Sequence, residues 1–173
     1  MIKKKITITG ALGLIGKELI KVLHNKNYEL VAVDLKGQML RHKKFIRNYT
    51  NKNIKFISCD INSSKIIKIT KNCHTIIHLA AMLGVENTER DKKKCWHINA
   101  TGTQNILKAC KTNNINHMIF SSSSEVYGEQ IFKKINEDHP LLGNNIYAMA
   151  KIASENLIKT FKKNNKKFNY CNL

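Results

Sequence analysis

Short apolar runs recur along the chain, and longer segments that mix polar and apolar residues separate them. The runs are rich in Ile, Val, Phe and Thr and lie at residues 5–9, 29–34, 54–59, 75–80 and 117–121. Runs of this length and composition are typical of buried β-strands. The helix-length mixed segments between them predict helices at residues 14–26, 91–112 and 146–163.

This alternation of strand and helix predicts an α/β fold with a doubly wound parallel sheet, because parallel neighbours need crossover connections. With 42% hydrophobic residues, residues 1–173 can bury one core and are interpreted as one domain. Residues 37–52 are ambiguous, whereas residues 128–145, with the only proline, predict a surface loop that could act as a lid. Residues 169–173 resemble the start of a sixth strand.

Composition narrows the function classes. The formal net charge is +18, yet the cations are 27 Lys and 3 Arg spread along the chain. Nucleic-acid surfaces cluster their cations and favour Arg, so we expect no nucleic-acid partner, while anionic small molecules are attracted. No apolar run reaches the roughly 18 residues of a membrane span. Five dispersed cysteines, and His74 and His78 without a third ligand, indicate reduced thiols in a cytoplasmic protein with no metal site.

A glycine-rich turn follows the first predicted strand and opens the first helix. It reads Gly10-Ala-Leu-Gly13-Leu-Ile-Gly16. Glycines at such points allow a tight turn, close approach of a pyrophosphate to the backbone, and close helix packing. Asp34 ends the next strand, where a carboxylate accepts both ribose hydroxyls and repels a 2′-phosphate. The pattern therefore predicts NAD rather than NADP as cofactor.

Tyr147 and Lys151 lie four residues apart in a predicted helix. Residues with this spacing share one helical face, so the lysine can act on the same substrate as the tyrosine. A tyrosine serves as a base near neutral pH only when its pKa is lowered well below ~10. Taken alone, the same spacing also fits an ordinary amphipathic helix.

Together these motifs resemble the NAD-dependent epimerase/dehydratase family, the extended branch of the short-chain dehydrogenase/reductase superfamily. The resemblance covers residues 4–173 and implies a Rossmann fold. Further motifs occur along the chain in the same order as in the family. They are Asp60-Ile61, His78-Leu79-Ala80-Ala81, Asn99-Ala-Thr-Gly-Thr and Ser121-Ser-Ser-Ser-Glu-Val-Tyr-Gly128. By this resemblance the cofactor-binding residues are Gly10, Gly13, Leu14, Ile15, Gly16, Asp34, Asp60, Ile61, Leu79, Ala80, Ala81, Asn99 and Lys151.

The resemblance also implies a mechanism on a nucleotide sugar. Ser123 would hydrogen-bond the reacting hydroxyl, Tyr147 would remove its proton, and Lys151, with the nicotinamide ring, would lower the Tyr147 pKa. Glu125 matches the second acid/base of sugar dehydratases and of a uronic-acid decarboxylase group, although a helix cap or a side chain that points to solvent is the alternative. Ser124 departs from the Asp of deoxythymidine-diphosphate sugar dehydratases, so epimerisation, dehydration and decarboxylation all remain open.

Members of this family continue into a smaller C-terminal domain that binds the nucleotide sugar, and this chain does not include it. We therefore expect a truncated Rossmann domain whose isolated activity is uncertain, with a homodimer or a complementing C-terminal polypeptide as partner. The alternative is a non-catalytic NAD-binding fragment or a subunit of a split enzyme.

Overall fold

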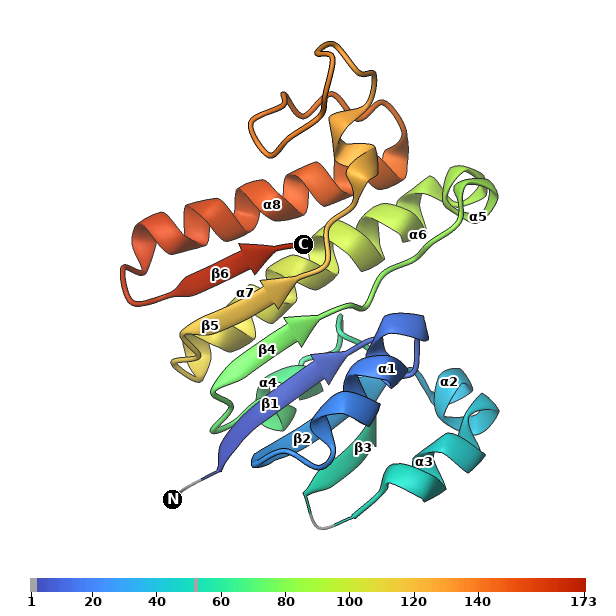
Figure 1. Ribbon diagram of the computed structural model, residues 1–173, viewed down its shortest axis with the longest axis vertical. Helices are drawn as coiled ribbons and strands as arrows, with labels where there is room; N and C mark the ends of the chain where they lie inside the picture. Colours follow the sequence, from blue (N-terminus) through green and yellow to red (C-terminus); the bar gives the residue numbers. More distant parts are fainter. Residues whose placement is uncertain (1–2, 52) are drawn as a thin grey trace.

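The computed structural model describes residues 3–51 and 53–173 and contains a six-stranded parallel sheet (Figure 1). The strand order is β3-β2-β1-β4-β5-β6. The strands are β1 (Lys4–Thr9), β2 (Tyr28–Asp34), β3 (Ile54–Ser58), β4 (Thr75–His78), β5 (His117–Phe120) and β6 (Asn169–Asn172). This topology confirms the predicted doubly wound α/β fold. The order reverses between β1 and β4, and ligands of such sheets bind at the carboxyl ends of the strands beside that reversal.

Helices pack against both faces of the sheet. They are α1 (Leu14–Leu23), α2 (Lys36–Arg41), α3 (Lys43–Tyr49), α4 (Lys65–Ile69), α5 (Val85–Arg90), α6 (Lys92–Trp96), α7 (Gly102–Thr112) and α8 (Ile146–Asn164), with the π-helix η1 (His97–Thr101) and the 3-10 helix η2 (Ser124–Tyr127). Helix α8 begins at Ile146 as predicted, and residues 128–145 form the predicted loop. Among the described residues, no helix is long and apolar enough to span a bilayer.

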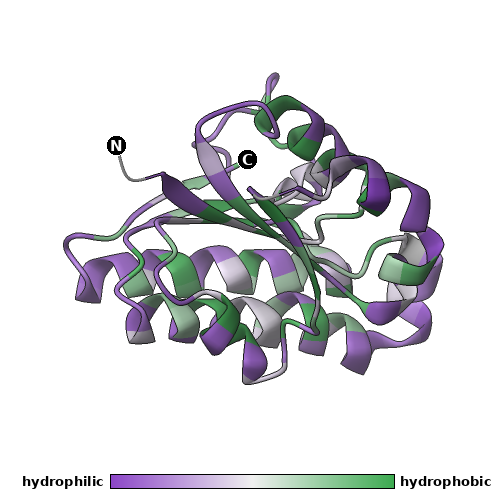
Figure 2. Cartoon of the chain, turned by 90° about the horizontal axis from the view of Figure 1, so that it is seen from below, coloured by the Kyte–Doolittle hydropathy of each residue, from purple (hydrophilic) through white to green (hydrophobic). Residues whose placement is uncertain are grey.

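Two apolar clusters fill the space between the layers. One packs α4, α7 and α8 against the sheet through residues such as Ile66, Ile106, Ile158 and Phe120. The other packs α1 and α3 against β1, β2 and β3. Figure 2 shows a layer of helices beneath the sheet and hydrophobic residues concentrated along the central strands. The alternating side-chain directions of each strand separate the two clusters.

Several predicted boundaries differ from the structure. The predicted helix 14–26 ends at Leu23, because residues 25–27 form the polar turn into β2. The predicted strand 75–80 ends at His78, beyond which the chain enters a loop. The ambiguous segment 37–52 forms most of α2 and α3, and its residue 52 lies outside the described residues. The predicted helix 91–112 is interrupted by the π-turn of η1, and α4 and α5 were not predicted.

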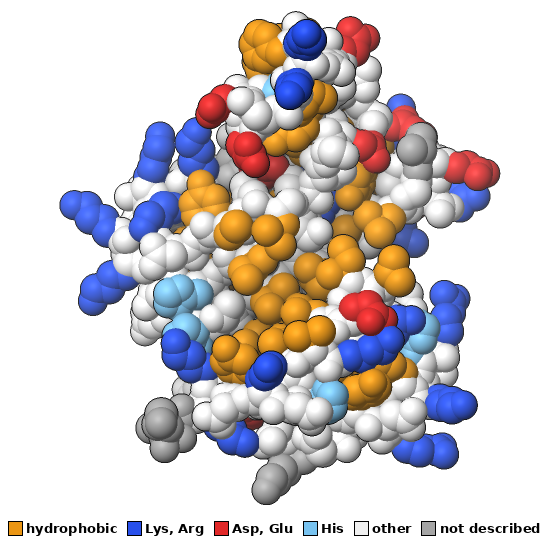
Figure 3. Space-filling view, in the orientation of Figure 1, with side chains coloured by type: hydrophobic (Ala, Val, Ile, Leu, Met, Phe, Trp, Pro, Cys, Tyr) orange, Lys and Arg blue, Asp and Glu red, His pale blue; other side chains and the backbone are white. Residues whose placement is uncertain are grey.

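One face of β5 and β6 has little helical cover. Ile119 is only partly buried against the α1 side of the sheet, while Cys171 is exposed and Leu173 is 72% exposed. Figure 3 shows hydrophobic side chains across the middle of this view, with Lys and Arg mostly around its outline. Exposed hydrophobic side chains therefore extend over the part of the sheet that has little helical cover.

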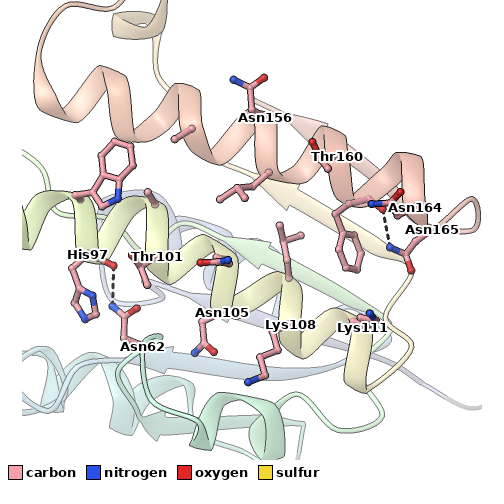
Figure 4. A pocket seen from close by; sticks show the side chains of 17 residues that line it. Asn62, His97, Thr101, Asn105, Lys108, Lys111, Asn156, Thr160, Asn164 and Asn165 are labelled. Carbon is pink, nitrogen blue, oxygen red and sulfur yellow. Dashed lines mark hydrogen bonds between the residues drawn. The ribbon is translucent and has the colours of Figure 1, made fainter.

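A groove of about 1100 Å³ lies on the opposite side, between α7 and α8. Figure 4 shows that Asn, Thr and Lys side chains of both helices line it, together with the exposed Trp96 of α6. Asn62 closes one end by donating to the His97 carbonyl at 3.2 Å. None of the predicted catalytic residues lines this groove.

Candidate functional site

The glycine turn connects β1 to α1 at the reversal of strand order. Gly10 has φ +66°, and a Cβ placed there would lie 2.7 Å from the Ala80 backbone nitrogen. A Cβ at Gly16 would lie 2.6 Å from the carbonyl oxygens of Gly10 and Ala11. Both positions therefore exclude a side chain, and the turn closes through the Gly13 N–H, which donates to the Gly10 carbonyl at 3.1 Å.

Asp34 fastens this turn to the end of β2. Its two carboxylate oxygens accept from the Leu12 and Leu35 backbone N–H groups, each at 2.8 Å. A carboxylate oxygen has two lone pairs, so each keeps acceptor capacity for a further hydroxyl. Asp34 is only partly buried. The arrangement can thus hold a ribose while it also fixes the turn.

The remaining predicted cofactor residues fall into three environments. Leu14 and Ile15 begin α1 with exposed side chains, 81% and 60% respectively. Asp60 is exposed and accepts from the Asn62 N–H at 2.8 Å, whereas Ile61 is buried. The segment Leu79-Ala80-Ala81 is partly buried and packs its backbone against Gly10. The structure therefore brings the turn, Asp34 and the loop after β4 together, while Asp60 and Ile61 point in different directions.

These observations test whether a dinucleotide fits. The turn leaves backbone open at the N-terminus of α1, where unpaired N–H groups and the helix dipole favour a phosphate. At Gly13 a Cβ would have only the Gly10 carbonyl oxygen nearby, at 3.3 Å, so the missing side chain leaves this backbone open to a pyrophosphate, with the acceptor carboxylate of Asp34 placed for the adjoining ribose. The residues fit NAD.

Asn99 connects the loop after β4 to the helices behind it. Its side-chain oxygen accepts from the Met82 N–H at 2.9 Å, and its nitrogen donates to the Met82 carbonyl at 3.1 Å. Asn99 is 2% exposed and lies in the π-helix η1. A π-turn inserts one residue into the helical repeat. We infer that this insertion turns the amide toward the loop and holds it in place.

His78 lies at the centre of a buried hydroxyl network. Its Nδ1 lies 2.7 Å from the Thr9 hydroxyl and its Nε2 lies 3.2 Å from the Thr103 hydroxyl. Thr103 donates to the Asn99 carbonyl at 2.7 Å, so its oxygen accepts from Nε2–H and Nδ1 accepts from Thr9. A neutral imidazole satisfies every partner. Burial, with a smaller effect of Lys151, lowers the His78 pKa to about 3.

The predicted catalytic residues meet at the carboxyl end of β5. Ser123 lies near enough to Tyr147 to lower the tyrosine pKa, and the ammonium of Lys151 lies 5.7 Å from the Tyr147 ring centroid. Lys151 Nζ donates to the Ser121 carbonyl at 2.7 Å and lies 4.7 Å from the Phe120 ring. Tyr147, Lys151 and Ser123 thus form one cluster although 28 positions separate Ser123 from Lys151 in the chain.

Burial dominates the electrostatics of this cluster. Desolvation raises the Tyr147 pKa, Ser123 opposes that rise, and Glu125 adds to it. Lys151 is 3% exposed, and burial lowers its pKa to about 8 although Glu155 favours its charged form. The lowered Tyr147 pKa implied by the family concerns the complex with nicotinamide as well as Lys151, so it stays a prediction.

Glu125 helps to form the start of α8. Its carboxylate accepts from the Asn145 side chain at 2.9 Å, and Asn145 caps α8 by accepting from the Ala148 N–H at 2.8 Å. Glu89 of α5 accepts from the Ile146 N–H at 3.1 Å. Acceptors at a helix N-terminus satisfy its free N–H groups. Glu125 therefore holds the capping residue Asn145 and does not itself accept from an N–H of α8, and its carboxylate raises the Tyr147 pKa.

Several residues of the site were not predicted. They are Thr9, Thr103, Ser154, Ser122, Glu155, Asn145 and Glu89. Asn145 had a readable signal, because Asn directly before a helical segment is a common N-cap. The sequence also gave a signal for Glu155, because an acidic residue four positions after Lys151 lies on the same face of the helix. His74, in contrast, stacks on the His117 ring at 4.6 Å, and no group of three metal-type ligands occurs in the described part of the chain.

Comparison with known proteins identifies the family of the chain. Residues 6–173 match the model of the NAD dependent epimerase/dehydratase family. The UDP-glucose 4-epimerase of Dictyostelium discoideum is 30% identical over 162 residues, which cover 91% of this chain and 47% of that protein. The trifunctional UDP-glucose 4,6-dehydratase/UDP-4-keto-6-deoxy-D-glucose 3,5-epimerase/UDP-4-keto-L-rhamnose-reductase of Arabidopsis thaliana is 32% identical over 167 residues, 91% of this chain and 25% of that protein.

A solved structure shows the same architecture. The UDP-glucuronic acid 4-epimerase from Bacillus cereus, in complex with UDP-glucuronic acid and NAD, superposes with a TM-score of 0.82 at 28% identity. The match covers 97% of this chain and 55% of that one. The chain spans about half the length of the 4-epimerases it matches. The chain belongs to the NAD dependent epimerase/dehydratase family.

Proposed function

We propose that this chain is the NAD-binding and proton-transfer portion of a nucleotide-sugar epimerase/dehydratase-type oxidoreductase. The observation that carries the proposal is the position of the buried Lys151 ammonium, 5.7 Å from the Tyr147 ring centroid, with Ser123 near the same tyrosine. The glycine turn and Asp34 lie at the same edge of the sheet, since all six strands are parallel. Cofactor and acid/base residues therefore serve one site.

Each residue has a defined task in this proposal. The glycine turn and the start of α1 hold the pyrophosphate, and Asp34 holds the adenosine ribose. Bound NAD supplies the hydride acceptor that oxidation of a sugar carbinol requires. Ser123 orients the reacting hydroxyl, and Tyr147 Oη takes its proton. Lys151 stabilises the phenolate of Tyr147 and binds the nicotinamide ribose.

The raised pKa of Tyr147 sets a requirement for this chemistry. A neutral phenol is a hydrogen-bond donor, so the half-buried Tyr147, with its raised pKa, starts in the wrong protonation state for a base. Positive charge near the phenol favours its ionised form. Lys151 is the cation that lies over the ring, and its charge must persist in the low-dielectric site.

The reaction that follows oxidation depends on Glu125. As a general acid/base, Glu125 would support dehydration or decarboxylation, as in the dehydratase relatives. As a cap that holds Asn145, it would leave epimerisation as the outcome. We propose the epimerase/dehydratase class and leave the choice of nucleotide sugar to substrate panels.

A second candidate function is NAD binding without turnover, either as a fragment or as a subunit of a split enzyme. The raised Tyr147 pKa and the open face of β5 and β6 favour it for the isolated chain. A complementing polypeptide that covers this face would restore substrate binding. A homodimer through the groove between α7 and α8 is the alternative assembly. Light scattering of the purified chain, alone and co-expressed with a C-terminal half of a relative, distinguishes the two.

The test of cofactor binding is calorimetric titration of the chain with NAD and, in parallel, with NADP. We expect saturable heat with NAD and at least tenfold weaker binding of NADP, because Asp34 repels a 2′-phosphate. Asp34→Ala should reduce this discrimination between NAD and NADP. Gly37→Ala serves as the control, because Gly37 lies in α2 and is not one of the predicted cofactor-binding residues. An absence of heat at millimolar NAD contradicts the proposal.

The test of the base is Tyr147→Phe in the assembled protein, followed through absorbance at the reduced-nicotinamide band on addition of nucleotide sugars. We expect turnover to fall by about a thousandfold or more, since proton transfer by a positioned base contributes 10²–10⁴-fold. NAD affinity and thermal stability should change little. Undiminished turnover would show that Tyr147 is not the base.

A further inference from the structure

Helix α8 contacts three consecutive serines with three residues spaced four apart. Lys151 donates to the Ser121 carbonyl, the Glu155 carboxylate accepts from the Ser122 hydroxyl, and Tyr147 lies near Ser123. Residues i, i+4 and i+8 lie along one face of a helix. The proposed base and its cation are thus the first two members of a stripe whose third member is Glu155.

Glu155 is the only one of the three whose role the family resemblance leaves open. Its side chain is half-buried, and its contact with Ser122 is charge-assisted, which makes such bonds shorter and stronger than neutral ones. The Ser122 N–H also donates to the Leu173 carbonyl at 2.8 Å. Ser122 therefore connects α8 to the edge strand β6.

Lys151 is surrounded by few compensating charges. The groups that face it are Glu155 and Tyr147 on α8, Cys95 on α6, His78 on β4, and the Phe120 ring and Ser121 carbonyl at the end of β5. His78 is neutral, Cys95 is a buried thiol with a raised pKa, and Tyr147 is a neutral phenol. Among these groups, Glu155 supplies the full negative charge.

We propose that Glu155 is a positioning residue of the site: its carboxylate fastens the serine loop to α8 through Ser122 and holds the ammonium of Lys151 in its charged form beside Tyr147. This inference rests on the proposed function for its catalytic meaning. The residue does not touch the reacting atoms in this scheme. It acts through Lys151 and through the loop that carries Ser123.

The physical reason is the burial of Lys151. Desolvation disfavours an ammonium, and a neutral amine could not stabilise the Tyr147 phenolate. An opposite charge one helical turn away counteracts desolvation, as the upward effect of Glu155 on the Lys151 pKa indicates. The hydrogen bond between Glu155 and Ser122, here called the tether, acts separately. It fixes the serine loop and with it the Ser121 carbonyl to which Lys151 donates.

The test uses the chain as it is and needs no turnover. Carbon-13 labelling at the lysine ε-carbon follows the titration of Lys151 by NMR, with its signal assigned by loss in Lys151→Met. In Glu155→Gln, which keeps an acceptor oxygen but loses the charge, we expect the midpoint to fall. The ratio of neutral to charged Lys151 near pH 7 should rise on the order of tenfold. Asn156→Ala, at the exposed neighbouring position of α8, should leave the midpoint unchanged.

Two further variants separate charge from tether. Ser122→Ala keeps the charge, so the Lys151 midpoint should stay near the wild-type value while amide exchange at residues 121–123 speeds up about tenfold. Glu155→Asp should return the midpoint toward that of the wild type. The proposal is overturned if Glu155→Gln titrates like Asn156→Ala, or if Ser122→Ala leaves exchange unchanged. If Glu155→Gln does not fold, Glu155→Asp and Ser122→Ala decide the matter.

These outcomes are independent of the proposed function. Failure to bind NAD would refute the oxidoreductase proposal and leave the Lys151 titration intact. An unshifted Lys151 midpoint would refute the role of Glu155 while NAD binding and the Tyr147 result stand. In the assembled enzyme, Glu155→Gln should move the alkaline limb of the pH–rate profile to lower pH, which a purely structural role would not do.

Discussion

The glycine turn after β1 and the serine loop after β5 lie at the same edge of the sheet but are built on opposite principles. The turn is made of backbone, and its key positions work because Gly10 and Gly16 have no side chain. The serine loop works through side chains that α8 holds from outside, among them the buried ammonium of Lys151. The glycine turn excludes side chains, whereas the serine loop holds titratable side chains in a buried site.

This difference has a consequence for stability. A turn that leaves space for a phosphate costs little, because its backbone groups pair within the turn and with Asp34. Burying titratable groups is costly, since desolvation disfavours their charged forms. We therefore expect pH to act on the β4–β5–α8 region and sterics to act on the turn. Sites of chemistry commonly carry such a stability cost.

The largest expected effect is the loss of folding stability at acid pH that the protonation of His78 causes. Its pKa is about 3 in the fold against an ordinary 6.5, so between these values the unfolded chain binds a proton that the folded chain does not. The stability linked to His78 is therefore complete above pH 6.5 and is lost as the pH falls toward 3, by on the order of 4 kcal/mol. Urea unfolding from pH 7 down to pH 4 measures it.

His78→Leu provides the comparison for this prediction. The variant loses the Thr9 and Thr103 contacts and should be less stable than wild type at pH 7, but its stability should depend less on pH across that window. His24→Gln, at a partly buried position outside the network of Thr9, His78 and Thr103, is the control variant. Equal pH slopes for His78→Leu and wild type would contradict the assignment of acid sensitivity to this residue.

The next effect concerns the turn. Gly10→Ala should destabilise the fold by about 3 kcal/mol, because a side chain at φ +66° is strained and its Cβ would meet the Ala80 backbone. Gly37→Ala is the matched control, since nothing lies within 4 Å of its Cβ and it lies in α2. That control should stabilise slightly, by about 0.5 to 1 kcal/mol. Urea midpoints at pH 7 compare them, and equal effects would show that the close approach is not needed.

The smallest effect has the opposite sign. Lys151→Met should stabilise the fold at pH 7 by about 2 kcal/mol, because it removes a buried charge at the cost of one hydrogen bond to Ser121. The wild-type ammonium loses its proton at about pH 8 in the fold but at an ordinary 10.5 when unfolded, so wild-type stability rises over that interval. The advantage of Lys151→Met should therefore shrink above pH 8. Thermal melts at pH 7 and pH 9.5 test it, and a destabilised variant at pH 7 would mean that Lys151 is a net structural contributor.

Local sequence patterns predicted those elements that depend on interactions between residues close together in the chain. The strand–turn–helix around Gly10, Gly13 and Gly16 and the start of α8 at Ile146 matched closely. Periodicity also placed five of the strands. It did not predict α2 and α3 within the polar segment 37–52, because their apolar side chains, such as Phe45 and Tyr49, gain stability only by packing on β1–β3.

The candidate site divides in the same way. Tyr147, Lys151 and Ser123 were predicted from motifs, and the structure places them in contact, while their catalytic roles stay predictions. The π-turn that presents Asn99 could not be read from the sequence, since it depends on a contact with Met82 that lies 17 positions away. The tautomer of His78 likewise depends on Thr9 and Thr103, which lie on other elements.

The amino-acid sequence alone was enough to place the first five strands along the chain, the glycine turn and the spacing of Tyr147 and Lys151, and these features carry the resemblance to the family. These features are local, because they follow from side-chain period, glycine freedom and helical spacing. The environment of the titratable groups follows from the folded chain: which groups are buried, that Ser122 pairs with Glu155, and that desolvation lowers the Lys151 pKa. A pKa depends on every element packed around a group, and the chain brings those elements together only when it folds.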